Sequence, residues 1–162
     1  VSVHHLTLTD KELHGFDSAV KVNPPLRTNK DCKALIKGIK DGTIDIITSD
    51  HNPIDIENKK VEFSAAKSGT IGLESLFGAL NNSIEFAVFI ENITTKPRAI
   101  FNLNIPKIEI GEKADITLFN PNKNYIFSKN DIISTSKNSA FLNKELNGKA
   151  YGIFANNQLV IK

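Results

Sequence analysis

Apolar and polar positions follow two different patterns along the chain, and the first pattern covers its N-terminal part. Alternation predicts a strand over residues 1–8, helical spacing predicts a helix over residues 31–40, and an isoleucine-rich run predicts a short strand over residues 43–48. The helix should end at Asp41-Gly42, because a glycine after the last turn readily adopts a positive φ. A helix that turns directly into such a run is the second half of a parallel βαβ unit, so this part of the chain is predicted to be α/β.

The middle of the chain predicts a long loop followed by helices. Residues 52–68 are polar and indicate a loop over the end of the preceding strand. Residues 73–90 place apolar side chains on one helix face at a period of about 3.6, although Asn81-Asn82-Ser83 should weaken or split that helix. Either residue of Thr94-Thr95 can cap a further short helix, whose first turn contains Pro97.

The pattern changes after Asn104 into short β-type runs separated by polar turns. These runs cover residues 114–119, 125–127, 149–155 and 158–161. Asn156-Asn157 predicts a two-residue hairpin turn, because asparagine tolerates a positive φ. We therefore predict an α/β part over residues 1–105 and a small β part over residues 106–162.

The composition is typical of a soluble globular protein, with 40% hydrophobic and 23% charged residues among 162. The formal net charge is only +2 and the lysines are scattered, which argues against a nucleic-acid partner. No apolar run approaches the roughly 20 residues that span a bilayer, so no membrane segment is expected. The single cysteine, Cys32, fits a reducing, cytoplasmic location. The chain lacks methionine and opens inside an apolar run, so we expect it to be a fragment of a longer protein.

Two polar segments occupy positions that suit chemistry. Ser49-Asp50-His51 follows the second predicted strand, and a carboxylate and an imidazole at the end of a buried strand suit acid–base or metal chemistry. Asn23 precedes two prolines in a loop, where its side-chain amide offers both a donor and an acceptor. Asp50 could instead cap the following loop, and Asn23 could form an Asx turn, so the residues alone leave both interpretations open.

Five short motifs occur together and in order: His4-His5-Leu6, Lys21-Val22-Asn23-Pro24-Pro25-Leu26-Arg27, Asp41-Gly42-Thr43-Ile44-Asp45, Ser49-Asp50-His51 and Gly69-Thr70-Ile71-Gly72-Leu73-Glu74. Their order and spacing resemble the C-terminal part of dihydroorotase, in the amidohydrolase superfamily. The resemblance is strong over residues 1–105, and the remainder resembles the small β-sandwich that flanks the barrel in these enzymes.

This resemblance implies the C-terminal part of a TIM-type (β/α)8 metal-dependent hydrolase barrel together with part of a flanking β-sandwich. It implies the reversible cyclisation of N-carbamoyl-L-aspartate to dihydroorotate in de novo pyrimidine biosynthesis. It also implies one or two zinc ions, most of whose ligands should lie upstream of Val1. The expected partners are a small-molecule substrate and further copies of the same subunit in a homo-oligomer.

The resemblance assigns roles to four residues. Asp50 matches the carboxylate that contacts the metal and moves a proton to or from the amide nitrogen, so it is the expected catalytic and metal-binding residue. Asn23, Ser68 and Gly69 match substrate-binding positions. For Gly69 a simple role as a turn residue is an equal alternative.

The histidines are secondary candidates. His51 is typical of the motif, but a lone histidine is more often a structural hydrogen-bonding residue than a metal ligand. His4 and His5, on a predicted strand, should point to opposite faces and shape the mouth of the barrel. Direct metal ligation by His5 stays open as an alternative.

One departure from the family pattern leaves the substrate in question. The family usually has a histidine that binds the substrate carboxylate where this chain has Ile54, and losing such a contact typically costs ~1.5–3 kcal/mol. Lys59 or Lys67 could supply a replacement cation. Ile54 favours one alternative, a non-catalytic paralogue that acts as a scaffold, for example for aspartate carbamoyltransferase. The Asn-Pro-Pro-Leu-Arg motif is loosely shared by relatives that act on hydantoin or allantoin, so an enzyme of the same fold with one of these substrates is a second alternative.

Overall fold

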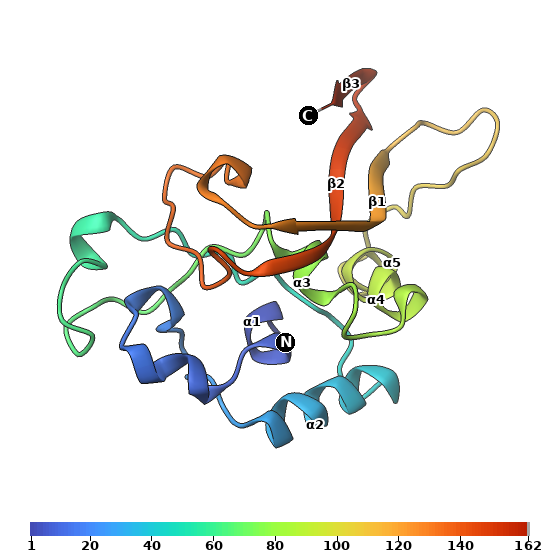
Figure 1. Ribbon diagram of the computed structural model, residues 1–162. Helices are drawn as coiled ribbons and strands as arrows, with labels where there is room; N and C mark the ends of the chain where they lie inside the picture. Colours follow the sequence, from blue (N-terminus) through green and yellow to red (C-terminus); the bar gives the residue numbers. More distant parts are fainter. Residues whose placement is uncertain (162) are drawn as a thin grey trace.

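The computed structural model describes residues 1–161, with helices below and beside a three-stranded antiparallel sheet in the view of Figure 1. The helices are α1 (Val3–Thr7), α2 (Asn29–Lys40), α3 (Leu76–Leu80), α4 (Phe86–Ile93) and α5 (Thr95–Ile100). The strands are β1 (Ile116–Ile126), β2 (Glu145–Ala155) and β3 (Gln158–Ile161). Short 3-10 turns occur at Asp10–Gly15, Ser18–Val20, Ile56–Asn58 and Lys129–Asp131. Contacts of α3 with both α1 and β2 join the N-terminal helices to the sheet.

The helix predicted from apolar spacing is confirmed as α2, and its ends follow from the local sequence. The Asp31 carboxylate accepts hydrogen bonds from the amide and the hydroxyl of Thr28, at 3.0 and 2.6 Å. The bond from the Thr28 amide engages one of the backbone N–H groups that a helix start otherwise leaves unpaired. The helix ends before Gly42, which has a φ of 80°. Its inner face buries Cys32 and Ile39.

The strand predicted over residues 1–8 is wrong, because α1 occupies most of that segment. Val3 and Leu6 are both buried and lie three residues apart, a spacing that places them on one face of a helix. The Thr7 hydroxyl also donates to the Val3 carbonyl at 2.9 Å, within the helix. The alternation of apolar residues at the start of the chain was therefore a misleading signal for strand.

The strand predicted over residues 43–48 is reduced to a single parallel bridge between Ser2 and Thr48. The Val3 amide donates to the Thr48 carbonyl, and the Thr48 amide donates to the Val1 carbonyl, both at 2.9 Å. The parallel direction expected of a βαβ unit is thus confirmed, with α2 as its crossover. The expected strand lengths are not found within the part of the chain that the structure describes.

The long helix predicted over residues 73–90 is split, as the polar residues in its middle indicated. The break between α3 and α4 begins at Asn81, whose side-chain amide donates to the Pro121 carbonyl and to the Asn147 side chain, both at 2.7 Å. The break therefore connects the helices to the sheet. The predicted short helix is confirmed as α5, with Pro97 in its first turn.

The sheet has the order β1-β2-β3. β1 joins two predicted runs into one strand, but its pairing with β2 is irregular between Asn120 and Asn124. Pro121 lies in this interval and has no amide hydrogen for the ladder. The predicted hairpin turn is confirmed, because Asn156 and Asn157 have φ values of 51° and 59° and connect β2 to β3.

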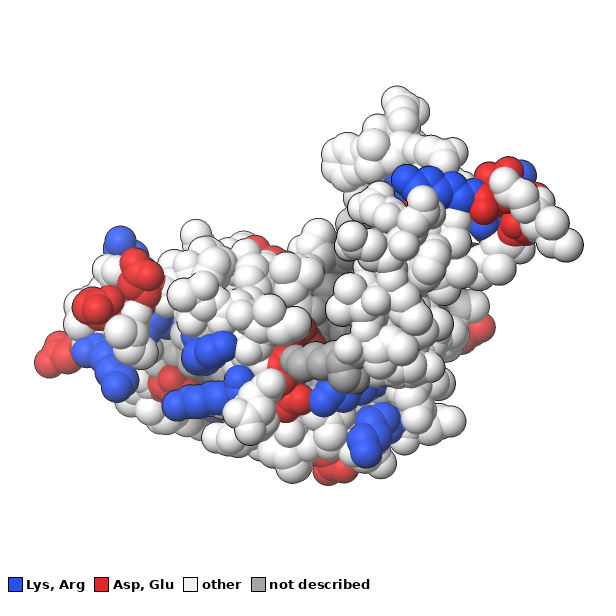
Figure 2. Space-filling view, turned by 90° about the horizontal axis from the view of Figure 1, so that it is seen from above, with Lys and Arg blue, Asp and Glu red and all other residues white. Residues whose placement is uncertain are grey.

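One cluster of buried apolar side chains joins the helices to the sheet and includes Val3, Leu6, Ile39, Leu80, Phe89, Phe127 and Leu146. The cluster contains residues from both sides of position 105. The division of the chain into residues 1–105 and 106–162 therefore stays a prediction. Among residues 1–161 no helix combines the length and the apolar character that crossing a membrane requires. Figure 2 shows acidic and basic side chains interspersed on the face seen from above, rather than gathered into one basic surface.

Candidate active site

Two residues predicted to share a site, Asp50 and Asn23, line the same hollow of about 480 Å³. The hollow is lined by Val1, Ser2, His5, Asn23, Pro24, Leu35, Thr48 and Asp50. Within residues 1–161 neither the Asp50 carboxylate nor the Asn23 side-chain amide forms a hydrogen bond, and both residues are exposed. Both polar groups are therefore available to a ligand in the hollow.

The backbone around Asp50 is held on both sides by parallel bridges. Thr48 pairs with Ser2 before it, and His51 pairs with Thr70 after it. Asp50 itself has a φ of 44°, in the left-handed region that aspartate tolerates better than most residues. Gly72 permits a close approach to this segment, because a Cβ atom there would lie 2.1 Å from the Ser49 carbonyl oxygen.

His5 lines the hollow, but both of its ring nitrogens are engaged. Nε2 lies 2.8 Å from the Pro24 carbonyl oxygen, which can only accept, so Nε2 carries the proton and donates. Nδ1 lies 2.6 Å from the Ser2 hydroxyl and accepts its hydrogen bond. His5 therefore holds the loop that carries Asn23, and neither nitrogen has a lone pair free for a metal ion.

His4 lies on α1 instead of on the predicted strand, and its side chain is completely buried. Its ring stacks on Phe141 with a centroid distance of 5.6 Å. Burial lowers the pKa of His4 to about 4, against the opposing effect of the negative charge of Asp50. His4 is thus a neutral core residue near the hollow. No pattern in the sequence indicated that this histidine would be buried.

His51 points away from the hollow into a separate hydrogen-bond network. Its Nδ1 accepts from the amides of Gly72 at 3.3 Å and Leu73 at 3.2 Å, so Nε2 carries the proton and donates to the Ser134 hydroxyl at 3.3 Å. The Ser134 hydroxyl donates in turn to the Glu74 carboxylate. Burial opposes ionisation of Glu74, but the hydrogen bonds from Ser134 outweigh it and lower the pKa of Glu74.

Ser68 and Gly69 do not line the hollow of Asp50. The Gly69 amide donates to the Lys21 carbonyl at 2.8 Å, and the Gly69 carbonyl accepts from Lys59 Nζ at 2.9 Å and from the Asn138 side chain at 3.2 Å. Gly69 has no polar group left for a substrate. The amide and hydroxyl of Ser68 form no hydrogen bond within residues 1–161, so Ser68 is the open residue of this turn.

Ile54 lies beside the turn at Gly69, since a Cβ atom on Gly69 would meet Ile54 Cγ1 at 3.0 Å. Of the two lysines considered as replacement cations, Lys59 is 4% exposed and its ammonium donates to the Lys67 and Gly69 carbonyls. Its charge is therefore committed to the backbone. The Lys67 side chain is exposed and forms no hydrogen bond or ion pair among the residues described.

The described residues do not form a complete metal site. No group of three or more histidine, cysteine or acidic side chains that could hold an ion occurs within residues 1–161. Asp50 offers one carboxylate, whereas a catalytic zinc ion usually has three or four protein ligands. A metal ion at this hollow would need further ligands from polypeptide beyond these residues.

Comparison with known proteins identifies the family. Residues 3–150 match the model of the Amidohydrolase family. The chain is 38% identical to the dihydroorotase of Caldicellulosiruptor saccharolyticus over 98% of its own length and 38% of that protein. It is 40% identical to the dihydroorotase of Bacillus subtilis over 87% of its length and 34% of that protein. The chain thus spans little more than a third of the curated relatives that it matches.

Solved structures show the same fold. The L-hydantoinase of Arthrobacter aurescens superposes with a TM-score of 0.89 at 20% identity, over 99% of this chain and 38% of that one. The D-hydantoinase of a Thermus species superposes with a TM-score of 0.85 at 22% identity, over the same shares. With a family model that matches nearly the whole sequence, the chain belongs to the amidohydrolase family.

Proposed function

We propose that the protein containing this chain is a dihydroorotase, which reversibly cyclises N-carbamoyl-L-aspartate to dihydroorotate in de novo pyrimidine biosynthesis. The observation that carries the proposal is the shared hollow of Asp50 and Asn23, the carboxylate and amide that the family motifs predicted. The identity of 38% to a curated dihydroorotase over 98% of the chain supports this substrate class.

Asp50 is the proposed proton carrier. In the hydrolytic direction a water oxygen bonds to the ring carbonyl carbon, the carbon–nitrogen bond breaks, and the leaving nitrogen must gain a proton. A free carboxylate can take the proton that the water loses and deliver it to that nitrogen. Cyclisation reverses each transfer, with water as the product. Asn23 can donate its amide hydrogens to a substrate oxygen and accept from a ureide N–H, which would orient the ring.

The proposal includes one or two zinc ions, and Asp50 is the only residue of this chain that we propose as a zinc ligand. When bound, zinc would supply Lewis acidity toward the substrate carbonyl. The described residues lack the remaining ligands, so these would come from polypeptide outside the chain. We likewise propose that, in the whole protein, residues 1–105 form part of a (β/α)8 barrel and residues 106–162 form part of a flanking β-sandwich. The whole protein is proposed to be a cytoplasmic homo-oligomer.

A second candidate substrate is favoured by Ile54. An isoleucine at the position where the family binds the substrate carboxylate suits a cyclic ureide that lacks this group, such as hydantoin. The decisive experiment measures turnover of dihydroorotate, N-carbamoyl-L-aspartate and hydantoin by the full-length protein. Preference for dihydroorotate supports the proposal, and preference for hydantoin replaces it with the second candidate.

If the full-length protein turns over none of the three compounds, both candidate substrate classes are contradicted. In that case co-purification with aspartate carbamoyltransferase, measured by size-exclusion chromatography, would support the scaffold alternative.

A further inference from the structure

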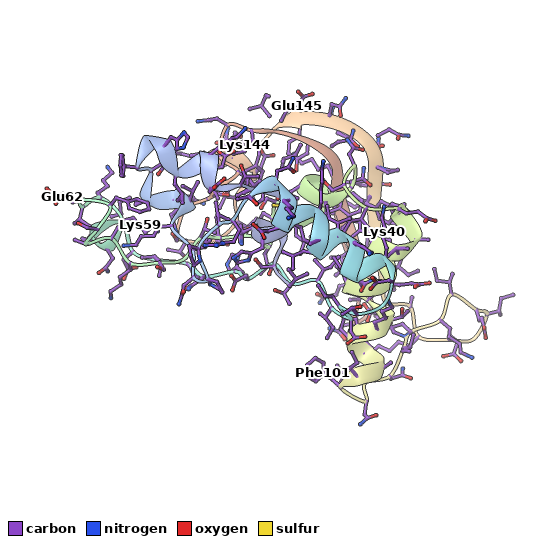
Figure 3. The ribbon with its side chains drawn as sticks, turned by 90° about the horizontal axis from the view of Figure 1, so that it is seen from below. Lys40, Lys59, Glu62, Phe101, Lys144 and Glu145 are labelled. Atoms are coloured by element: carbon purple, nitrogen blue, oxygen red, sulfur yellow. The ribbon has the colours of Figure 1, made fainter. Side chains whose placement is uncertain are left out.

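Lys59 is a buried cation that forms no ion pair among residues 1–161. Its side chain is 4% exposed, and its ammonium donates to two backbone carbonyls, those of Lys67 and Gly69, at 2.9 Å each. Figure 3 shows Lys59 within the loop segment, whereas Glu62 lies at its outer end. Burying an ammonium group is costly unless hydrogen bonds replace its water, so this arrangement strongly disfavours positions of the loop that break them.

The two carbonyls bracket Ser68. Lys59 thus fixes the backbone on both sides of the one residue of this turn whose amide and hydroxyl are free. Hydrogen bonds to a charged donor are roughly twice as strong as neutral ones, so Lys59 provides the strongest contacts of the turn.

The same turn is packed against the segment that carries Asp50. A Cβ atom on Gly69 would lie 2.9 Å from the Asn52 side chain, and Gly69 has a φ of 137°, which other residues rarely adopt. The next residue, Thr70, pairs with His51. A displacement of the turn would therefore disturb both Ser68 and the backbone next to Asp50.

We propose that Lys59 is a positioning residue, which holds the Ser68-Gly69 turn through the Lys67 and Gly69 carbonyls so that Ser68 can bind the cyclic amide substrate. This inference rests on the proposed function and adds a determinant of substrate affinity to it. In this role Lys59 does not replace the carboxylate-binding histidine that the family has at the position of Ile54, because its ammonium group is already hydrogen-bonded to backbone carbonyls.

The test compares variants of the full-length protein in dihydroorotate hydrolysis. Lys59→Met removes the ammonium at similar length, and we expect KM to rise about tenfold while kcat changes less than about threefold, because the lost contact acts in substrate binding. Lys59→Arg keeps the charge and should recover most of the affinity. Lys60→Met, the neighbouring exposed lysine, is the matched control and should keep the wild-type KM. If the methionine variant does not fold, Lys59→Gln takes its place with the same expected rise in KM.

Amide hydrogen exchange provides a readout that is independent of turnover. The Gly69 amide should exchange about tenfold faster or more in Lys59→Met than in Lys60→Met, because the turn opens more often. An active wild type whose Lys59→Met variant keeps its KM, or keeps slow exchange at Gly69, would overturn the inference and leave the proposed function intact. A folded wild type without cyclic-amide turnover would instead overturn the proposed function, and the role of Lys59 in substrate affinity with it.

Discussion

Asp50 carries both the proposed chemistry and an unusual backbone conformation, so the choice of substitution matters. Asparagine has the same shape and tolerates a φ of 44°, but it cannot take up a proton. We expect Asp50→Asn in the full-length protein to lower kcat by about a hundredfold or more, with a stability change below about 1 kcal/mol. Steady-state kinetics and urea unfolding would measure the two effects.

Asp50→Ala is the companion variant. It should also abolish turnover while the fold survives, but alanine is poorly suited to the left-handed region and should add a cost of about 1 kcal/mol. Near-normal turnover by either variant would count against the role of Asp50.

His4 predicts a pH dependence of stability. Its pKa is about 4 in the folded chain against 6.5 for an exposed histidine, so the unfolded chain binds a proton between these values and the folded chain does not. Stability should therefore be lost as the pH falls from about 6.5 toward 4, by up to about 3 kcal/mol. Urea unfolding at a series of pH values would detect the loss. His4→Leu should flatten this profile, whereas replacement of the exposed His14 by glutamine should not; identical profiles for wild type and His4→Leu would refute the assignment.

Among single residues, the motifs of the sequence group Asp50 with Asn23, and the structure places both at one hollow. The motifs do not reveal that the polar groups of His5 and Gly69 already form hydrogen bonds within the protein. Their partners, Pro24 and Asn138, lie 19 and 69 positions away along the chain. Only the folded backbone brings such partners into hydrogen-bonding range.

At the level of elements, substitutions at the N-terminus of α2 test how much the Thr28 side chain stabilises this helix. The Thr28 hydroxyl donates to Asp31, and Thr28→Ala should lower the free energy of unfolding by about 1 kcal/mol through loss of this cap. Thr28→Ser keeps the hydroxyl and should retain most of the stability. Chemical denaturation of both variants would measure the difference, and equal losses in the two would show that the hydroxyl is not responsible.

The helices and the hairpin were predictable where local chemistry decides them. A cap at Thr28, a proline in the first turn of α5 and two asparagines at the β2–β3 turn act over a few residues. The two strands predicted over residues 1–8 and 43–48 were not found, because a strand depends on pairing partners that are distant in sequence. Residues 1–8 have too little neighbouring strand in the described chain to pair with, and their apolar residues instead pack as one turn of helix.

For the whole molecule, the isolated chain of 162 residues should have no dihydroorotase activity, with or without added zinc. Its hollow supplies a single free carboxylate, and no cluster of three potential ligands occurs within residues 1–161. A carbamoyl-aspartate cyclisation assay on the purified chain, beside a full-length relative as positive control, would measure this. Turnover by the isolated chain would contradict it.

Much of this protein can be read directly from the order of its residues. Family membership, the presence of Asp50 and Asn23 at one site, a helix over residues 31–40 and the β2–β3 turn follow from motifs, spacing and short-range backbone chemistry. Whether each polar group is available to a ligand does not follow from these local features. Whether His5, His51, Gly69 and Lys59 face a ligand or the protein depends on partners distant in sequence, because a hydrogen bond depends on where atoms meet in space.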